Sequence, residues 1–522
     1  MSIVTAFRRL ASAAAVFFGR HGSVTQLAEQ RAVSRQSLYR EANGALQNVE
    51  GTASQHRLEE LSQRLQQYEH RIAELEQRLA QAVIVDADKQ AHYASCAQAE
   101  GVSLPVARRL LAVFLEARTP SVAQLGRFSQ AAAQRSTRLL AVLDAASRPL
   151  VAQAAADEIF VGRKPILMVV AQESLCWTNG RLAEHRDGPT WAAELRQLPA
   201  LEQLTRDSGS GMAKGLEQVN DERRRQGLPS IADQSDHFHL RQAGARALRR
   251  LQGQAARALE RAERTQKELD RRWRRGQNRS GCVTAAGKQW RVAEAALDRW
   301  SAQEDAWRRL CVVLPLFTPE GALNTRRRAT QVVAEVLPQL AGEEWAKVRR
   351  LLQRPEVFTY LDQVEEKLAA LPAAPELRQA VVDGEGLRRH PELLQGKGPS
   401  AGAAWGVLLL AGVVLARGGA AGAQAGAAVR GVLQQAWRAS SLVEGLNSVL
   451  RMQQARHRRL SQGLLDLKRL YWNCREFRTG KRKKQTPYAR LGLTLPTADW
   501  WALLMIPPEQ LRQQVSTPKV AA

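Results

Sequence analysis

Apolar residues recur at helical spacing along most of the chain, and the pattern typical of strands is confined to one stretch. Between residues 157 and 185, short β-branched and aromatic runs at 159–161, 166–170 and 175–178 alternate with turn residues. This pattern predicts three short antiparallel strands. A helix at 189–198, a strand at 201–205, a helix after a glycine-rich loop and a short segment at 231–240 are expected to follow.

Strands and helices in this order are typical of a ribonuclease-H-like core. The expected fold class is therefore α+β and multidomain, with a mixed sheet at the centre. Residues 151–240 would form the first part of this core and residues 439–480 its last helices. Between them, helical spacing over 241–438 predicts a large all-α insertion, and residues 481–522 are expected to form a basic, irregular tail.

Near the amino terminus, residues 22–46 have the pattern of a helix-turn-helix within a domain of residues 1–50. A helix at 26–31 and a turn at 32–33 precede Ser34, which is expected to cap a second helix. Leu27, Ala28, Val33 and Leu38 would face inward. The second helix offers a major groove the side chains of Arg35, Gln36, Tyr39, Arg40 and Asn43. An ordinary helical hairpin has the same pattern, and the positive charge of the chain favours DNA binding.

Residues 56–84 are predicted to form a coiled coil. The apolar positions follow one another at alternating steps of three and four, at Leu58, Leu61, Leu65, Tyr68, Ile72, Leu75 and Leu79. Such a seam requires a partner helix, so a homodimer or a higher homo-oligomer is expected. A hairpin within one chain is the alternative.

A second helical domain is expected over residues 95–150. Within it, residues 119–143 have the pattern of a cap, a short helix, a turn and a long helix, which indicates either a second helix-turn-helix or a packing linker. Arg127, Gln134, Arg135 and Arg138 would lie on its polar side.

The composition favours a polyanionic partner. The 522 residues include 76 Lys and Arg against 51 Asp and Glu, which gives a net charge of +25, and 44% are hydrophobic. Such a chain can bury a core, and nucleic acid or an anionic membrane surface would attract it. The 5 cysteines form no CxxC pair, so a disulfide scaffold or zinc ribbon is not expected and a reducing compartment is.

Two apolar segments bear on location. Residues 6–19 resemble a signal peptide, but the apolar run is short and the helix-turn-helix pattern follows it closely. Residues 401–415 are rich in Ala and Gly and fall short of the ~20 residues of a spanning helix, so a buried helix is expected. These features predict a cytoplasmic protein with no membrane partner.

Three acidic residues at element edges are candidates for a site with two divalent metal ions. They are Asp157 on the first strand, Asp207 after the fourth, and Glu444 on a late helix. Glu158 competes with Asp157, because neighbouring residues on a strand point to opposite faces. A long gap precedes Glu444, so Asp383, Glu385 and Glu392 compete with it.

Here the sequence resembles a known family. The segment 440–451, together with the residues up to Gly492, is similar to the last acidic segment of insertion-sequence transposases of the DDE type. DEIF at Asp157 and RDSGSGMAKGL at Asp207 resemble the first two acidic motifs of that family. Asp236-His237-Phe238-His239 is similar to an element that several of these enzymes carry shortly after the second acid.

The resemblance implies a transposase that binds the terminal inverted repeats of its element, cleaves a phosphodiester there and joins the freed 3′-hydroxyl to target DNA. Two Mg²⁺ or Mn²⁺ ions held by Asp157, Asp207 and Glu444 would be its cofactors. Asp236 and His239 would shape the site or be structural. The basic side beyond Glu444 could contact phosphates or be merely solvated; it comprises Arg451, Arg456, Arg458 and Arg459.

Two other functions remain open at this point. An inactive, domesticated transposase acting as a dimeric DNA-binding regulator is the main alternative, and a metal-dependent nuclease without strand transfer is another. No GxxxxGK[ST] motif is present, so a nucleotide cofactor is not expected.

Overall fold

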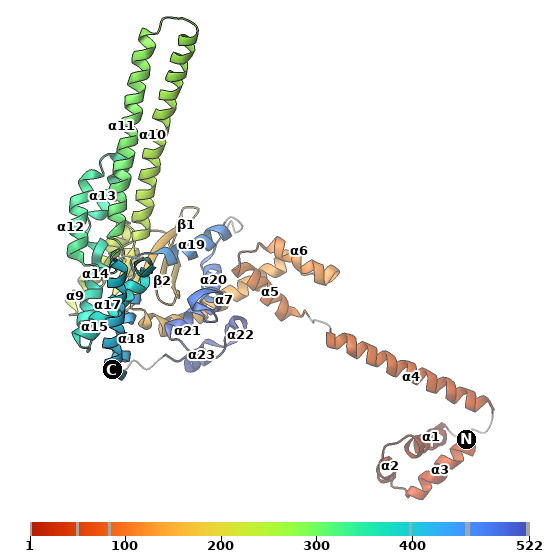
Figure 1. The fold of residues 1–522 in the computed structure, drawn as a ribbon. Helices are drawn as coiled ribbons and strands as arrows, with labels where there is room; N and C mark the ends of the chain where they lie inside the picture. The colour runs from red at the N-terminus through yellow and green to blue at the C-terminus, as the bar shows by residue number, and fades with distance from the viewer. Residues whose placement is uncertain (1–2, 48–51, 82–84, 396–398, 455–459, 518–522) are drawn as a thin grey trace. The chain divides into compact units, whose positions relative to one another are not determined.

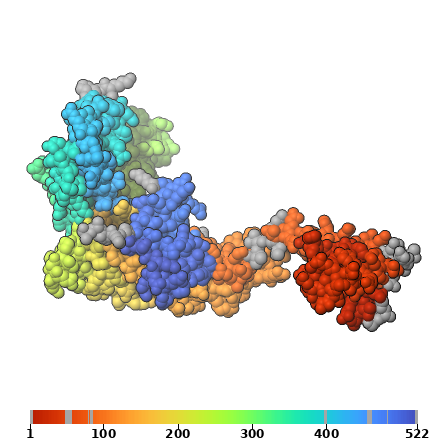
Figure 2. Space-filling model, turned by 90° about the horizontal axis from the view of Figure 1, so that it is seen from below, coloured from red at the N-terminus to blue at the C-terminus, as the bar shows by residue number. Residues whose placement is uncertain are grey.

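The structure is a computed structural model that describes residues 3–47, 52–81, 85–395, 399–454 and 460–517. The chain divides into two compact units, Met1–Asp86 and Ala87–Ala522 (Figure 1; Figure 2 gives a space-filling view). Each unit is described by itself.

The first unit contains the predicted helix-turn-helix. Helices α2 (Ser23–Arg31) and α3 (Arg35–Gln47) are joined by a turn in which Ala32 has a φ of 52°. Ser34 caps α3 as expected, because its Oγ accepts the backbone N–H of Ser37 at 3.2 Å. Ala28 and Leu38 are buried, but Val33 is exposed, so the expectation that it faces inward is wrong. It lies in the turn itself, beyond the reach of the helix contacts.

A further helix, α1 (Ile3–Phe17), completes this unit by packing on α3. The Ser12 Oγ lies 2.6 Å from the Glu41 Oε2, and Arg31 lies 3.7 Å from the same carboxylate oxygen. The segment that resembled a signal peptide is therefore a helix of the helix-turn-helix unit. The first unit also contains α4 (Thr52–Gln81), a single long helix that carries the heptad positions.

A five-stranded mixed sheet forms the centre of the second unit. Its strand order is β3-β2-β1-β4-β5, with β1, β2 and β3 antiparallel and β4 and β5 parallel to β1. The α+β class and the predicted order of elements are confirmed. The bounds are β1 (Gln153–Val161), β2 (Lys164–Ala171), β3 (Trp177–Leu182), α8 (Gly188–Leu195), β4 (Gln203–Arg206), α9 (Ser210–Arg225) and β5 (Ala232–Ser235).

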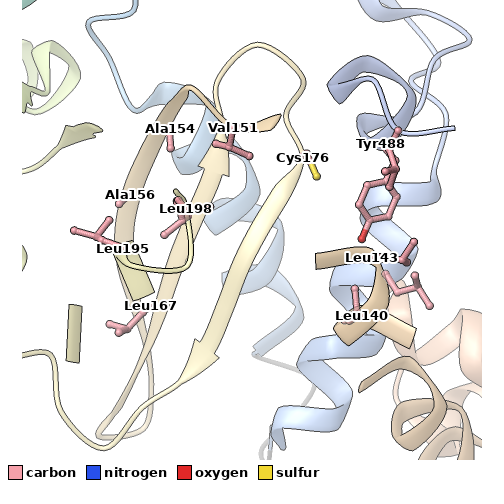
Figure 3. Close-up of a cluster of buried hydrophobic side chains, with 14 of the residues drawn as sticks. Leu140, Leu143, Val151, Ala154, Ala156, Leu167, Cys176, Leu195, Leu198 and Tyr488 are labelled. Carbon is pink, nitrogen blue, oxygen red and sulfur yellow. The ribbon is translucent and has the colours of Figure 1, made fainter. Parts of the chain in front are cut away.

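Successive residues of β1 bury their side chains on opposite faces of the sheet. Ala154 and Ala156 join a large apolar cluster with α7, α8, α9 and the carboxyl-terminal helices, part of which Figure 3 shows. Ala155 and Ile159 join a second cluster on the other face, where α19 (Ser441–Gln454) packs through Val443 and its neighbours. Odd-numbered positions of β1, including Asp157, therefore face α19.

The predicted all-α insertion is also confirmed for its described residues. Helix α10 (His237–Arg274) begins directly after β5, and α11 (Ser280–Val312) runs back beside it as a long hairpin (Figure 1). In the described part of 241–438 the only β pairing is an isolated bridge between Phe317 and Leu323. The remaining α-helices are α12 (Arg326–Val336), α13 (Ala346–Leu352), α14 (Thr359–Ala369), α15 (Pro375–Arg389), α16 (Glu392–Gln395), α17 (Pro399–Arg417) and α18 (Gly419–Gln434).

Helix α17 is not the buried helix that its composition predicts. Ala401 and Ala411 are buried, while Leu409 and Leu410 are 66% and 64% exposed. Small residues are exposed as well, since a Cβ at Gly406 or Gly412 would meet nothing within 4 Å, so most of the helix surface is open. By length and hydropathy alone, Ser400–Arg417 could cross a membrane, and it is the one such helix among the described residues.

The possible second helix-turn-helix is wrong. Residues 122–147 form one uninterrupted helix, α7 (Val122–Ser147), after α5 (Ala87–Ala99) and α6 (Leu104–Leu115). Gly126 does not end the helix, and Ser121 caps its start by accepting the N–H of Gln124. Helix α7 packs against α20 (Gln462–Cys474), where Asp144 and Arg469 form a buried ion pair at 2.8 Å. It is thus part of the core packing.

The carboxyl-terminal segment is not irregular as expected. It forms α21 (Pro487–Leu491), α22 (Trp500–Met505) and α23 (Pro508–Gln514). Tyr488, Leu503 and Leu511 are fully buried in the large apolar cluster. The burial of these side chains stabilises short helices that the basic, proline-containing sequence alone does not indicate.

Close packing of α8 on α9 leads to a first prediction. A Cβ at Gly215 would lie 2.7 Å from the Cβ of Trp191, so Gly215→Ala is expected to destabilise the protein by about 1–3 kcal/mol through overpacking. Gly287→Ala is the control, since nothing surrounds this glycine within α11; helix propensity should stabilise it by up to about 1 kcal/mol. Thermal unfolding measures the change in Tm for both variants. Equal changes would contradict the close packing of α8 on α9 at Gly215.

Candidate metal centre

Strand register places three acidic residues in a row across β1, β4 and β5, toward the carboxyl-terminal ends of these parallel strands. In the parallel pairing of β1 with β4, Ala156 lies opposite Arg206, and in that of β4 with β5, Arg206 lies opposite Ser235. The next residue along each strand direction is Asp157, Asp207 and Asp236, respectively. The row therefore follows from the pairing of three strands.

Asp157 is buried and held at both oxygens. Its Oδ1 accepts the backbone N–H of Glu158 at 2.8 Å, and its Oδ2 accepts the Nδ2 of Asn447 at 2.6 Å. Burial above all, together with the nearby carboxylates of Glu444 and Asp207, raises the pKa of Asp157 to about 7, against the lowering effect of the backbone hydrogen bond from Glu158.

Glu158 points to the opposite face and forms an ion pair with Arg186. Of the two neighbouring acids on β1, Asp157 is thus the one that lies in the cluster.

Asp207 follows the last residue of β4, directly before α9. Its Oδ1 accepts the backbone N–H of Gly209 at 2.8 Å, and a Cβ at Gly209 would lie 2.9 Å from the same oxygen. Asp207 also lines a cavity of about 540 Å³. Basic side chains in its wall include those of Arg163, Arg186 and Lys214.

Asp236 joins the two ends of the helical insertion. It caps α10, because its Oδ1 accepts the N–H of Phe238 at 2.7 Å. The same Oδ1 accepts the N–H of Ser440 at 3.0 Å, and the Ser440 hydroxyl donates to Oδ2. Since α19 begins at the next residue, these bonds place Glu444 in the first turn of a helix that starts beside the row of acids.

Two further side chains close the cluster from α10 and α19. One ligand atom each of Asp157, Asp207 and His239 lie within 4.8 Å of one another. The His239 Nε2 lies 3.6 Å from the Glu444 Oε1 and 3.7 Å from the Asp236 Oδ2. The three predicted acids and His239 therefore converge, whereas Asp236 is committed to the helix start and to Ser440.

The acids that competed with Glu444 have other partners. Asp383 accepts a hydrogen bond from Gln379 of its own helix, Glu385 pairs with Arg388, and Glu392 bonds His390. All three contacts are local to the insertion.

The basic residues beyond Glu444 are only partly described. Arg451 is exposed and its Nη1 lies 3.4 Å from the Glu444 Oε2. Arg456, Arg458 and Arg459 lie outside the described residues. In the first unit, Arg35, Gln36, Tyr39, Arg40 and Asn43 are all exposed on α3.

Asn447 belongs to the site and was not predicted. It is fully buried, and while its Nδ2 bonds Asp157, its Oδ1 is buried without a hydrogen-bond partner. Its place three residues after Glu444 puts both on one helix face, which was a usable signal. Hard divalent cations prefer oxygen ligands, so carboxylates with a nearby orphaned amide oxygen fit Mg²⁺ or Mn²⁺, and an imidazole is a better ligand for Mn²⁺.

Comparison with protein-family models, curated proteins and solved structures finds no match to this chain. The site must therefore be interpreted from its own geometry.

The raised pKa of Asp157 predicts how stability depends on pH. Between the ordinary value of 3.8 and about 7 the folded state binds more protons than the unfolded state, so this group destabilises the metal-free fold as pH rises. Asp157→Asn removes this group, so its effect on the free energy of unfolding, relative to the native chain, is expected to be more stabilising at pH 8 than at pH 5 by on the order of 2 kcal/mol. Thermal unfolding with a chelator present measures this, with Glu158→Gln as control. An equal effect at both pH values would contradict it.

Proposed function

We propose that this protein is a DNA transposase of the DDE type, a metal-dependent polynucleotidyl transferase. The observation that carries the proposal is the convergence of Asp157, Asp207 and Glu444 at one sheet edge, although a helical insertion separates the last from the others. These are the acids that resemble the motifs of that family, and a structural role alone would not require three carboxylates around one buried point.

A ribonuclease-H-like core is part of the proposal. The strand order β3-β2-β1-β4-β5, with three antiparallel strands followed by two parallel ones, supports it. The positions of the acids support it as well: Asp157 lies on the central strand β1, Asp207 follows the parallel strand β4, and Glu444 lies on α19, which packs on the sheet.

Asp157, Asp207 and Glu444 would hold two Mg²⁺ or Mn²⁺ ions, and His239 lies beside them, with a ligand atom within 4.8 Å of those of Asp157 and Asp207. Bound there, such ions increase the acidity of an attacking water or 3′-hydroxyl and neutralise charge on the leaving oxygen. The chain itself orients the carboxylates: Asn447 fixes the Asp157 Oδ2, and the Gly209 N–H fixes the Asp207 Oδ1.

The proposed reaction has two steps. Water attacks the phosphorus at the element end and breaks its bond to the O3′, which leaves a free 3′-hydroxyl. This hydroxyl then attacks a target phosphodiester in line and displaces another 3′ oxygen. Basic side chains beside Asp207, those of Arg163 and Lys214, are placed to contact the DNA backbone there.

Recognition of the terminal inverted repeats is assigned to α3. Its exposed Arg, Gln, Tyr and Asn side chains suit a major groove, and the net charge of +25 supports binding to DNA phosphates. Cytoplasmic location with nucleoid association when bound to DNA belongs to the same proposal.

The proposed chemistry predicts that Asp207→Asn abolishes cleavage and leaves binding to the element ends intact, because one ligand carboxylate is lost and the surface of α3 is unchanged. The assay uses supercoiled plasmid carrying the element ends with Mg²⁺, and a gel shift measures binding. Asp383→Asn is the matched control, since this acid bonds within the insertion.

The products separate the candidate functions. Joined DNA supports the transposase, nicks alone indicate a nuclease, and a salt-sensitive gel shift without cleavage indicates a regulator. Loss of end binding in Asp207→Asn would mean that this residue is structural.

Readout by α3 predicts that the double variant Gln36→Ala, Asn43→Ala loses specificity. A bidentate base contact contributes about 1–3 kcal/mol, so affinity for end DNA should fall at least about tenfold. Affinity for random duplex should change little, because no charge is removed. The control is the double variant Gln26→Ala, Gln30→Ala on α2, which also removes two uncharged side chains. Fluorescence anisotropy with both duplexes measures the ratio of the affinity for end DNA to the affinity for random DNA. An unchanged ratio would contradict readout by α3.

A further inference from the structure

The seam of α4 is an unpartnered apolar surface within the first unit. Its described side chains, from Leu58 to Leu75, are between 48% and 68% exposed. Six large apolar groups in one line on a single long helix are unusual for a surface that remains in water. With this spacing, the seam fits another helix of the same heptad repeat.

Charged residues flanking the seam identify the partner. With Leu58, Leu65 and Ile72 at heptad position a, and Leu61, Tyr68 and Leu75 at position d, each flank has its own sign. Position g is Arg throughout and position e is acidic in two of three heptads: Arg57, Arg64, Arg71 and Arg78 against Glu69 and Glu76.

This arrangement decides the orientation of a self-pairing. In a parallel coil, each g residue faces the e residue of the next heptad on the other helix, so Arg64 meets Glu69 and Arg71 meets Glu76, twice each. In an antiparallel coil, g faces g and e faces e, which sets Arg against Arg and Glu against Glu. Like charges so placed disfavour the antiparallel form.

We infer that the protein forms a homodimer through a parallel, in-register coiled coil of α4. The inference does not depend on the proposed transposase activity, because it rests on the seam and its flanking charges alone. Within one helix Arg64 pairs with Glu60, and Arg71 and Arg78 pair with Glu74. These exposed pairs within the helix contribute little and do not compete strongly with the contacts between helices.

A parallel coil has one consequence for the whole chain. The amino-terminal ends of both copies of α4 lie together, so two helix-turn-helix units are tethered at the same end of the coil. A dimer can then contact two copies of a DNA sequence at once, which raises apparent affinity through effective concentration.

Cysteine cross-linking of the full chain tests the orientation. In a parallel dimer, the two copies of a d position face each other, so Leu61→Cys and Leu75→Cys should each cross-link with themselves. In an antiparallel dimer, position 61 of one chain lies near the far end of the other, about 20 Å from its counterpart. Both variants are made in a chain in which the partly exposed Cys96, Cys282 and Cys311 are replaced by Ser. This chain without the added cysteine is the negative control for cross-linking.

Charge reversal tests the pairing. Glu69→Arg with Glu76→Arg sets four Arg–Arg contacts into a parallel dimer and should raise its dissociation constant on the order of tenfold or more. Mixing it with the double variant Arg64→Glu, Arg71→Glu should restore the dimer as a heterodimer. Glu59→Arg with Glu60→Arg makes the same change of charge away from the seam and should leave the dissociation constant nearly unchanged.

Sedimentation and light scattering give the mass, expected at twice the 57.8 kDa of one chain and halved by Leu65→Asp. A dimer that persists in Leu65→Asp would overturn the inference, as would a monomeric native chain. Absence of cross-links in both single cysteine variants would overturn the parallel orientation.

Discussion

The hydrogen bonds between Asp236 and Ser440 are the constraint on which the arrangement of the site depends. They connect residues 204 positions apart and fix the start of α10 and the start of α19 at one point. A second bond, from the His237 N–H to the Arg438 carbonyl, supports the same junction. Because the entropy of closing a loop grows only slowly with its length, an insertion of this size is tolerated once its ends are fixed. Glu444 reaches the row of acids for this reason.

The same junction concentrates negative charge, which has an energetic cost. Asp157 is buried beside Asp207 and Glu444, and burial and like charges both favour its protonated form. Among the described residues, Asn447 and the backbone N–H of Glu158 donate hydrogen bonds to Asp157, Gly209 donates one to Asp207, and Arg451 reaches Glu444 only at 3.4 Å. A cation at the centre would relieve the repulsion, so the arrangement is more consistent with metal binding than with a role in stabilising the fold.

The sequence predicted those parts of the fold in which local pattern and tertiary contact agree. The β-branched and aromatic runs, the turn signals and the cap at Ser34 were sufficient for the order of elements along the chain and for the helix-turn-helix. Asp157, Asp207 and Glu444 were expected to share one site from their positions at element edges and from the resemblance. The strand register and the junction at Asp236, which bring them together, were not predicted. The role of Asn447 was missed for the same reason.

The errors arose where packing overrides composition. A turn was expected within residues 119–143, yet burial of Leu125 and Leu139 accompanies one continuous helix, α7. In α17 the prediction of a buried helix failed, because only Ala401 and Ala411 are buried while Leu409 and Leu410 are exposed. Apolar content therefore predicts that a helix forms but not which side is buried. For α4, by contrast, the exposed side is also the regular one, and its flanking charges are ordered by sign. These two properties are what the proposed coiled coil rests on, and the leucines of α17 have no such order around them.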